Sequence, residues 1–93
     1  MFIGVLTIEL HIPLAGSLKG RRSVVKGMKD RIRSRFNVSV AEVGETDLWQ
    51  RATIGVACVS GDKTYAGQAL NKVVDMVRAS TSVELLDYTI EII

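Results

Sequence analysis

The strongest chemical pattern in the sequence is a concentration of cations between Leu18 and Phe36. This segment holds eight of the chain's twelve basic residues and one acid, Asp30, so its net charge is +7, while the rest of the chain carries −5. At about 100° per residue of a predicted helix, most of these cations fall on the two sides of an apolar stripe. The candidate residues for contact with a polyanion are Lys19, Arg22, Lys26, Lys29, Arg31, Arg33 and Arg35.

This arrangement favours nucleic acid as a partner. Long lysine and arginine side chains reach phosphates, and their binding releases the counterions held around the nucleic acid. Five such contacts predict a log–log salt slope of about −3.5 to −4.5. The side of the helix opposite the apolar stripe carries short side chains, at Gly20, Ser23, Gly27, Asp30 and Ser34. The alternative is a solvated helix face, because Lys and Arg are good helix formers and promote solubility.

The other reactive residue types form no catalytic constellation. Strand alternation directs Cys58 into the core and away from His11, so a thiol nucleophile with a histidine base is not expected. Three acidic residues lie close together in a turn-like segment without a histidine or cysteine, namely Glu42, Glu45 and Asp47. We therefore expect a non-enzymatic protein with no cofactor and no metal site.

Trp49 precedes a predicted strand and leaves two alternatives open. An exposed tryptophan could stack on a base or anchor an interface. A lone tryptophan could equally cover an edge of the core.

The elements that hold these residues follow from hydrophobic periodicity. Alternation predicts four strands, over residues 2–12, 38–43, 51–60 and 83–93. Helical spacing predicts one helix from a cap at Ser17 to about Phe36, with a left-handed ending at Asn37, and a second helix that follows Asp62 and ends near Ser80. The order βαββαβ predicts an α+β, ferredoxin-like sandwich, with a four-stranded antiparallel sheet and two helices on one face. Its length of 93 residues suits a single domain, 1–93.

The second face of the predicted sheet stays open. It would be lined by small or apolar residues, at Ile3, Val5, Thr7, Thr53, Gly55 and Ala57. RNA-recognition motifs carry aromatic residues on this face for base stacking, and none is present here. The face instead favours a homo-oligomer, with Trp49 as a further interface residue. A third alternative is a ligand-sensing dimer, with a small molecule beside Gly55 and Ala57.

Composition narrows the class of protein further. A hydrophobic content of 47% with 24% charged residues is too apolar for a disordered chain and too charged for a membrane protein. The single cysteine allows no internal disulfide. These features favour a cytoplasmic protein that does not associate with a membrane.

The chain resembles the YlxP-like family of uncharacterised small bacterial proteins in four stretches: IGVLTIELHIP, SLKGRRSVVKGMKDRIRSRFNVSVAEVG, DLWQRATIGVACVS and VELLDYTIEI. The resemblance implies a ferredoxin-like fold and supplies no catalytic residues. Genes of this family often lie beside those for translation initiation and ribosome-maturation factors, which implies a role near ribosomal RNA. We therefore expect an accessory protein that binds RNA or a ribosomal assembly particle through the basic helix. The alternative is a homo-oligomeric module whose basic helix docks on an acidic protein surface.

Overall fold

The computed structural model describes residues 1–13, 16–44 and 48–93. The elements in chain order are β1 (Phe2–His11), α1 (Leu18–Arg35), β2 (Ser39–Val43), β3 (Arg51–Ser60), α2 (Lys63–Arg78) and β4 (Glu84–Ile92). The predicted order is confirmed, and most boundaries agree within one or two residues.

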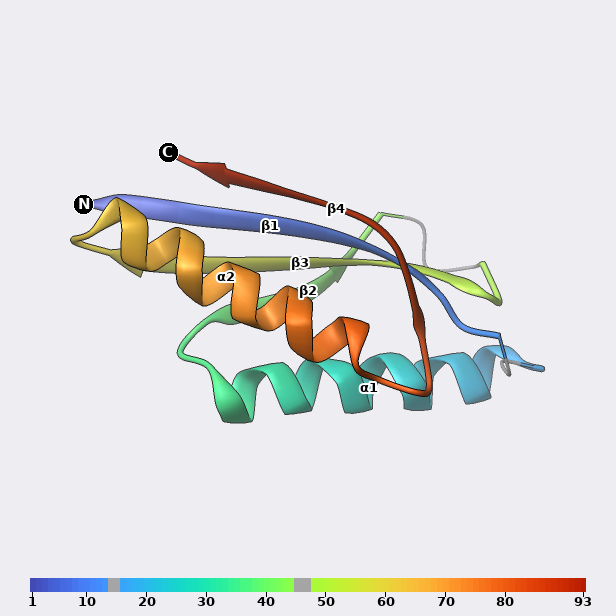
Figure 1. The fold of residues 1–93 in the computed structure, drawn as a ribbon. Helices are drawn as coiled ribbons and strands as arrows, with labels where there is room; N and C mark the ends of the chain where they lie inside the picture. The colour runs from blue at the N-terminus through green and yellow to red at the C-terminus, as the bar shows by residue number, and fades with distance from the viewer. Residues whose placement is uncertain (14–15, 45–47) are drawn as a thin grey trace.

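All strand pairs of the sheet are antiparallel, in the order β2-β3-β1-β4. Strands β1 and β3 pair over their full lengths, from Phe2 opposite Ser60 to His11 opposite Arg51. Both helices lie on the same side of this sheet, with α2 nearer to β1 in Figure 1 and α1 beyond it. The structure confirms the ferredoxin-like α+β fold.

The core lies between the helix layer and the sheet. Alternate residues of the central strands are fully buried there, including Leu6, Ile8 and Ile54. Burial of each large aliphatic side chain stabilises the fold by about 1.5–3 kcal/mol. The helices contribute Val25, Met28, Ile32, Ala66, Leu70, Val73, Val74 and Val77. The helical and strand periodicities of the sequence therefore identified the core faces correctly.

Both helices begin at residues whose side chains accept backbone hydrogen bonds. The Ser17 hydroxyl oxygen accepts from the Gly20 N–H at 3.0 Å, and the Asp62 carboxylate accepts from the Thr64 N–H at 2.8 Å. Each cap satisfies a donor that has no partner within the first turn. The predicted helix starts are confirmed.

The predicted left-handed ending at Asn37 is wrong. No described non-glycine residue has a positive φ, and α1 ends at Arg35 with Phe36 as its cap, whose backbone is extended. The Val38 N–H donates to the Phe36 carbonyl oxygen at 3.0 Å, which closes a three-residue turn centred on Asn37. Such an inverse γ-turn requires a negative φ at its central residue. The chain thus passes from α1 into β2 without the left-handed residue that ends many helices.

The regular alternation predicted for residues 83–93 is also wrong at one point. The register between β1 and β4 shifts between Glu9 and Leu10, which pair with Asp87 and Leu85 respectively. Leu86 is the extra residue of this bulge, and its side chain is exposed. A bulge leaves one residue without a partner on the neighbouring strand, and regular pairing of the two strands resumes beyond it.

No helix of the described residues combines the length and the apolar character needed to cross a membrane.

Candidate nucleic-acid interface

Helix α1 lies at the edge of the helix layer, where it packs mainly against β2, while α2 covers β1, β3 and β4. Its buried face consists of Arg21, Val25, Met28 and Ile32. The seven basic residues predicted to contact a polyanion all lie outside this buried face. The structure therefore brings them together on one helix that is open on several sides.

Arg21 is the exception among the cations of the segment, since it is 1% exposed. Its Nε and Nη2 atoms donate to the Arg51 carbonyl oxygen at 3.1 and 2.9 Å, and Nη2 also donates to the Glu42 carboxylate. Arg21 thus joins α1 to β2 and to the start of β3, and it adds no charge to the binding surface. Two sequence signals mark this role: Arg21 falls within the apolar stripe of the helix, and Glu42 alternates with Val40 on the helix-facing side of β2.

One row of cations follows the side of α1 that faces β2. We call it the β2-side row; it comprises Lys19, Arg22, Lys26, Lys29 and Arg33. A groove of about 340 Å³ runs along it, lined by four of these residues together with Val25, Asp30 and Glu42. Successive members are three or four residues apart, so their Cβ atoms lie about 5–6 Å from one another along one face. The row therefore presents cations at regular intervals.

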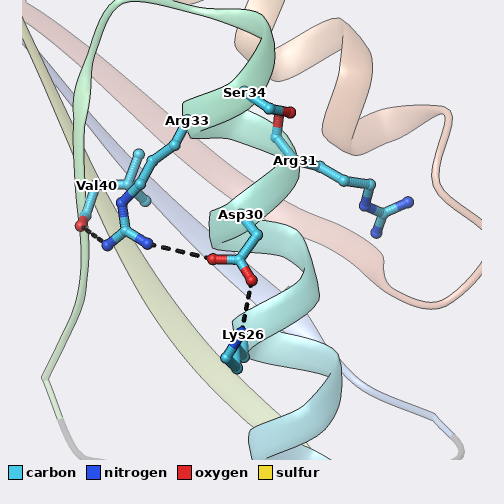
Figure 2. Close-up of polar contacts among 6 residues, drawn as sticks. All are labelled: Lys26, Asp30, Arg31, Arg33, Ser34 and Val40. Atoms are coloured by element: carbon cyan, nitrogen blue, oxygen red, sulfur yellow. Dashed lines mark hydrogen bonds and ion pairs between the residues drawn. The ribbon is translucent and has the colours of Figure 1, made fainter.

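Two members of the β2-side row are engaged within the protein (Figure 2). The Lys26 Nζ donates to Asp30 at 2.8 Å. Arg33 donates to the Val40 carbonyl oxygen at 2.8 Å and lies 3.5 Å from the same Asp30 carboxylate. Asp30 therefore partly neutralises the middle of the row.

The pKa of Asp30 is lowered from its ordinary value of 3.8. The largest cause is the hydrogen bond from Lys26, and the charges of Lys26, Arg33 and Lys29 act in the same direction. A lowered pKa keeps this carboxylate ionised throughout the neutral range. Asp30 thus subtracts a constant charge from the surface at any pH near 7.

The second row, here the α2-side row, consists of Arg31 and Arg35. Figure 2 shows Arg31 directed away from Asp30 and Arg33, on the other side of the helix. The guanidinium carbon of Arg35 lies 5.9 Å from the centroid of the Phe36 ring. A groove of about 550 Å³ separates this row from α2, and Lys72 of α2 also lines it.

Five of the seven predicted contact residues carry cations that form no ion pair within residues 1–13, 16–44 and 48–93: Lys19, Arg22, Lys29, Arg31 and Arg35. Between the two rows, Gly27 has open space where a Cβ would lie, with nothing within 4 Å. The surface of α1 is therefore a low ridge flanked by cations. Such a surface can approach a phosphate backbone closely.

Among the described residues, the remaining candidates lie apart from one another. Cys58 is buried and lies opposite Gly4 on β1, seven residues from His11, a separation of about 23 Å at 3.3 Å per residue. His11 lies 3.3 Å from the Glu84 carboxylate. Glu42 is occupied by Arg21, whereas Glu45 and Asp47 lie outside the described residues. No group of three potential metal ligands is present in the part of the chain that the structure describes.

Trp49 is 57% exposed and lies next to Gln50, whose side chain donates to the Pro13 carbonyl oxygen at 3.2 Å. More than half of the Trp49 surface is thus exposed, and contact of this residue with a partner stays a prediction.

The open sheet face has the residues predicted for it. Ile3, Val5, Thr53, Gly55 and Ala57 are all partly exposed on the side opposite the helices. The structure adds residues that the sequence analysis missed: Ser39, Ala41 and Val43 of β2 lie opposite residues of this face, and both Val59 of β3 and Ile93 pair with Ile3. A shallow hollow of about 250 Å³ lies over β2 and β3, between Val5, Val43 and Ala57.

Comparison with known proteins agrees with the fold and the sequence motifs. Residues 3–90 match a family described as Protein of unknown function (DUF503). The chain belongs to this family. It is also 37% identical over 82 residues to "Uncharacterized protein YlxP" of Bacillus subtilis (strain 168), an alignment that covers 88% of this chain and 89% of the relative. The resemblance to the YlxP-like family is confirmed, and functional inference depends on the surfaces described above.

Proposed function

We propose that this member of the DUF503 family is a non-enzymatic, cytoplasmic accessory protein that binds RNA through α1. The observation that supports this most is the pair of cation rows on either side of a ridge of short side chains. Ribosomal RNA, alone or in an assembly particle, is the RNA that the family resemblance implies.

The geometry of α1 suits an extended polyanion. The β2-side row runs from Lys19 to Arg33, about 21 Å at 1.5 Å per residue. Each long side chain on such a row can reach a separate phosphate, and the absence of a bulky side chain at Gly27 lets the backbone approach. Arg21 and the packing against β2 hold the helix in place before binding. Little backbone entropy is then lost on association, and the entropy cost falls mainly on the long cationic side chains.

Charge reversal at Arg22 and Lys29 tests this proposal. These two residues form no ion pair within the described ranges, whereas reversal of Lys26 or Arg33 would also break contacts with Asp30 and Val40. Binding of a fluorescent fragment of structured ribosomal RNA is measured by anisotropy across a salt series. Arg22→Glu/Lys29→Glu is expected to weaken binding by more than about tenfold and to reduce the salt slope by about two.

The single variants Arg22→Glu and Lys29→Glu are measured as well, and Lys63→Glu is the matched control for each of them. Lys63 is exposed on α2 and lines neither groove. RNA binding that is unchanged in the double variant, or reduced as much by Lys63→Glu as by Arg22→Glu, would refute a specific role for α1. Co-sedimentation with ribosomal particles, with the same variants, tests the larger target. Indifference to RNA with salt-sensitive binding to an acidic protein would favour the protein-docking alternative instead.

A second candidate function is supported by the open sheet face. Val59 and Ile93 are 67% and 69% exposed there, and Val43 extends the same apolar surface over β2. We propose that a second copy of this chain covers the face, since burial of apolar area drives such association. The hollow of about 250 Å³ falls below the usual range of small-molecule pockets, which gives the ligand-sensing alternative less support.

Sedimentation equilibrium over a range of protein concentrations tests self-association. A dimer is expected for the native chain and a monomer for Val59→Lys, because a charge cannot be buried unpaired at an apolar interface. Lys63→Glu should leave the dimer intact. A strict monomer at high concentration would rule out a second copy on this face.

A further inference from the structure

The groove between the C-terminal halves of α1 and α2 is lined by cationic, apolar and hydrogen-bonding side chains, whereas the two cation rows offer mainly charge. Its volume is about 550 Å³, within the range of small-ligand sites. Its lining comes from both helices and their ends: Arg31, Arg35, Phe36, Lys72, Asp75, Met76, Ala79 and Ser80. We infer that this groove binds one nucleoside phosphate unit, with the phosphate on its cations and the base on its apolar floor.

The charge of the groove favours an anion. Arg31, Arg35 and Lys72 form no ion pair in the described part of the chain, and the one acid of the lining, Asp75, lies 3.8 Å from Arg78 instead. Cations in the last turn of a helix also offset its dipole, which accounts for Arg35 without a ligand. That explanation does not extend to Lys72, which lies more than a turn before the end of α2. Three cations around one cavity therefore indicate a phosphate-sized partner.

The floor of the groove favours a flat ring. Phe36 and Met76 are partly buried and pack against the core, and Ala79 leaves space beside them. Bases stack on aromatic rings and on guanidinium planes. The Arg35 guanidinium lies over the Phe36 ring, 5.9 Å from its centroid, so a base entering the groove stacks on the outer face of the guanidinium or takes its place on the ring. Inorganic phosphate alone would leave this apolar floor unused.

The rim carries acceptors that suit a ribonucleoside. The Asp75 carboxylate has lone pairs that can accept from a ribose hydroxyl or a base amino group, and the Ser80 hydroxyl oxygen, which already accepts from the Ser82 N–H at 3.3 Å, has a second lone pair for the same role. The unit could come from a free nucleotide or from an unpaired nucleotide of RNA. The second source rests on the proposed function, and it would make the protein selective for RNA with unstacked bases.

Two substitutions test the groove without altering α1. Ala79→Leu fills the space over the floor at an exposed position, and Lys72→Gln removes one cation. Lys63→Gln is the matched control for the loss of charge. Far-UV circular dichroism and urea unfolding of each variant establish that the fold is intact.

Binding is measured by anisotropy with two labelled RNA hairpins that differ only in one bulged nucleotide. The native protein is expected to prefer the bulged hairpin by about tenfold, the equivalent of one base stacked on an aromatic ring. Ala79→Leu should abolish this preference, and Lys72→Gln should weaken binding of the bulged hairpin and lower its salt slope by about one. The reversal Arg22→Glu/Lys29→Glu should weaken both hairpins equally, which separates the groove from the α1 rows.

Free nucleoside monophosphate and inorganic phosphate are titrated in parallel and followed by amide chemical shifts of Lys72, Ala79 and Ser80. Saturable shifts with the mononucleotide that Ala79→Leu removes would identify the free nucleotide as sufficient. A preference for the bulged hairpin without such shifts would identify RNA as the source. Equal binding of inorganic phosphate and mononucleotide, or neither shifts nor a bulge preference, would overturn the inference even if both hairpins bind to the α1 rows.

Discussion

At the scale of single residues, the pair formed by Arg21 and Glu42 is the most consequential contact in the helix layer. Their side chains are 2% and 16% exposed, and Arg21 also saturates the Arg51 carbonyl oxygen. Arg21→Met would leave a poorly hydrated carboxylate and an unpaired carbonyl oxygen. We expect a loss of about 3–5 kcal/mol in the free energy of unfolding, measured by urea denaturation.

The double variant Arg21→Met/Glu42→Leu provides the control. It removes both charges, so part of the lost stability should return, although the Arg51 carbonyl oxygen still lacks its donors. A double variant less stable than Arg21→Met would show that the ion pair does not dominate the effect.

Asp30 supplies a pH-dependent test of the geometry of the β2-side row. Its folded pKa lies below 3.8, so its contribution to stability is present above the unfolded value and is lost as the pH falls through the folded value. A carboxyl-detected NMR titration at low salt should give a midpoint below 3.8. Lys26→Gln should raise that midpoint more than Lys29→Gln, because the Lys26 hydrogen bond is the largest cause. Equal shifts in the two variants would contradict the Lys26 contact.

The site residues were largely predictable at this scale because a helical wheel needs only local geometry. The seven cations of α1 that lie outside its buried face, six of them exposed and Lys29 partly buried, were identified in this way. Lys72 was missed because its proximity to Arg31 and Arg35 depends on how two helices lie over a sheet. Arg21 was counted in the charge of the segment, since its burial becomes evident only when Glu42 is placed opposite the apolar stripe.

At the scale of elements, we expect replacement by alanine to change the stability of the protein in opposite directions at two glycines. Gly27→Ala should stabilise α1 by about 1 kcal/mol, because its Cβ would meet open space and alanine has the higher helix propensity. Gly4→Ala should destabilise the protein by about 1–3 kcal/mol, because its Cβ would lie 2.8 Å from Leu70 Cδ1 and 3.0 Å from Cys58 Sγ. Urea denaturation of both variants provides the measurement, and the same sign for both would contradict the packing described for β1 and α2.

The elements themselves followed from periodicity, and the errors fall where non-local pairing decides. The turn centred on Asn37 depends on how α1 must enter β2, which local helix-ending preferences do not contain. The bulge at Leu86 depends on the register against β1, and residues 83–93 read alone show only alternation. Local chemistry determines that a helix or strand forms, whereas its ends and irregularities are set by its neighbours.

At the scale of the whole molecule, one sheet with β1 and β3 at its centre joins all the elements. Both helices bury their apolar faces in a common core, so partial unfolding of either layer exposes the other. We expect a single calorimetric transition with an enthalpy of about 65 kcal/mol near 60 °C, at about 0.7 kcal/mol for each of 93 residues. Agreement of the calorimetric and van't Hoff enthalpies would support one cooperative domain, and two resolved transitions would refute it.

The placement of both helices on one side of the sheet has a consequence for valency. A second copy seated on the bare side would leave each copy's α1 facing outward, at opposite ends of the pair. Such a dimer has two α1 surfaces that can bind two segments of one long RNA. Once the first segment is bound, the second segment is present at a high effective concentration near the other α1. The gain from such avidity can reach about a hundredfold or more without any new contact.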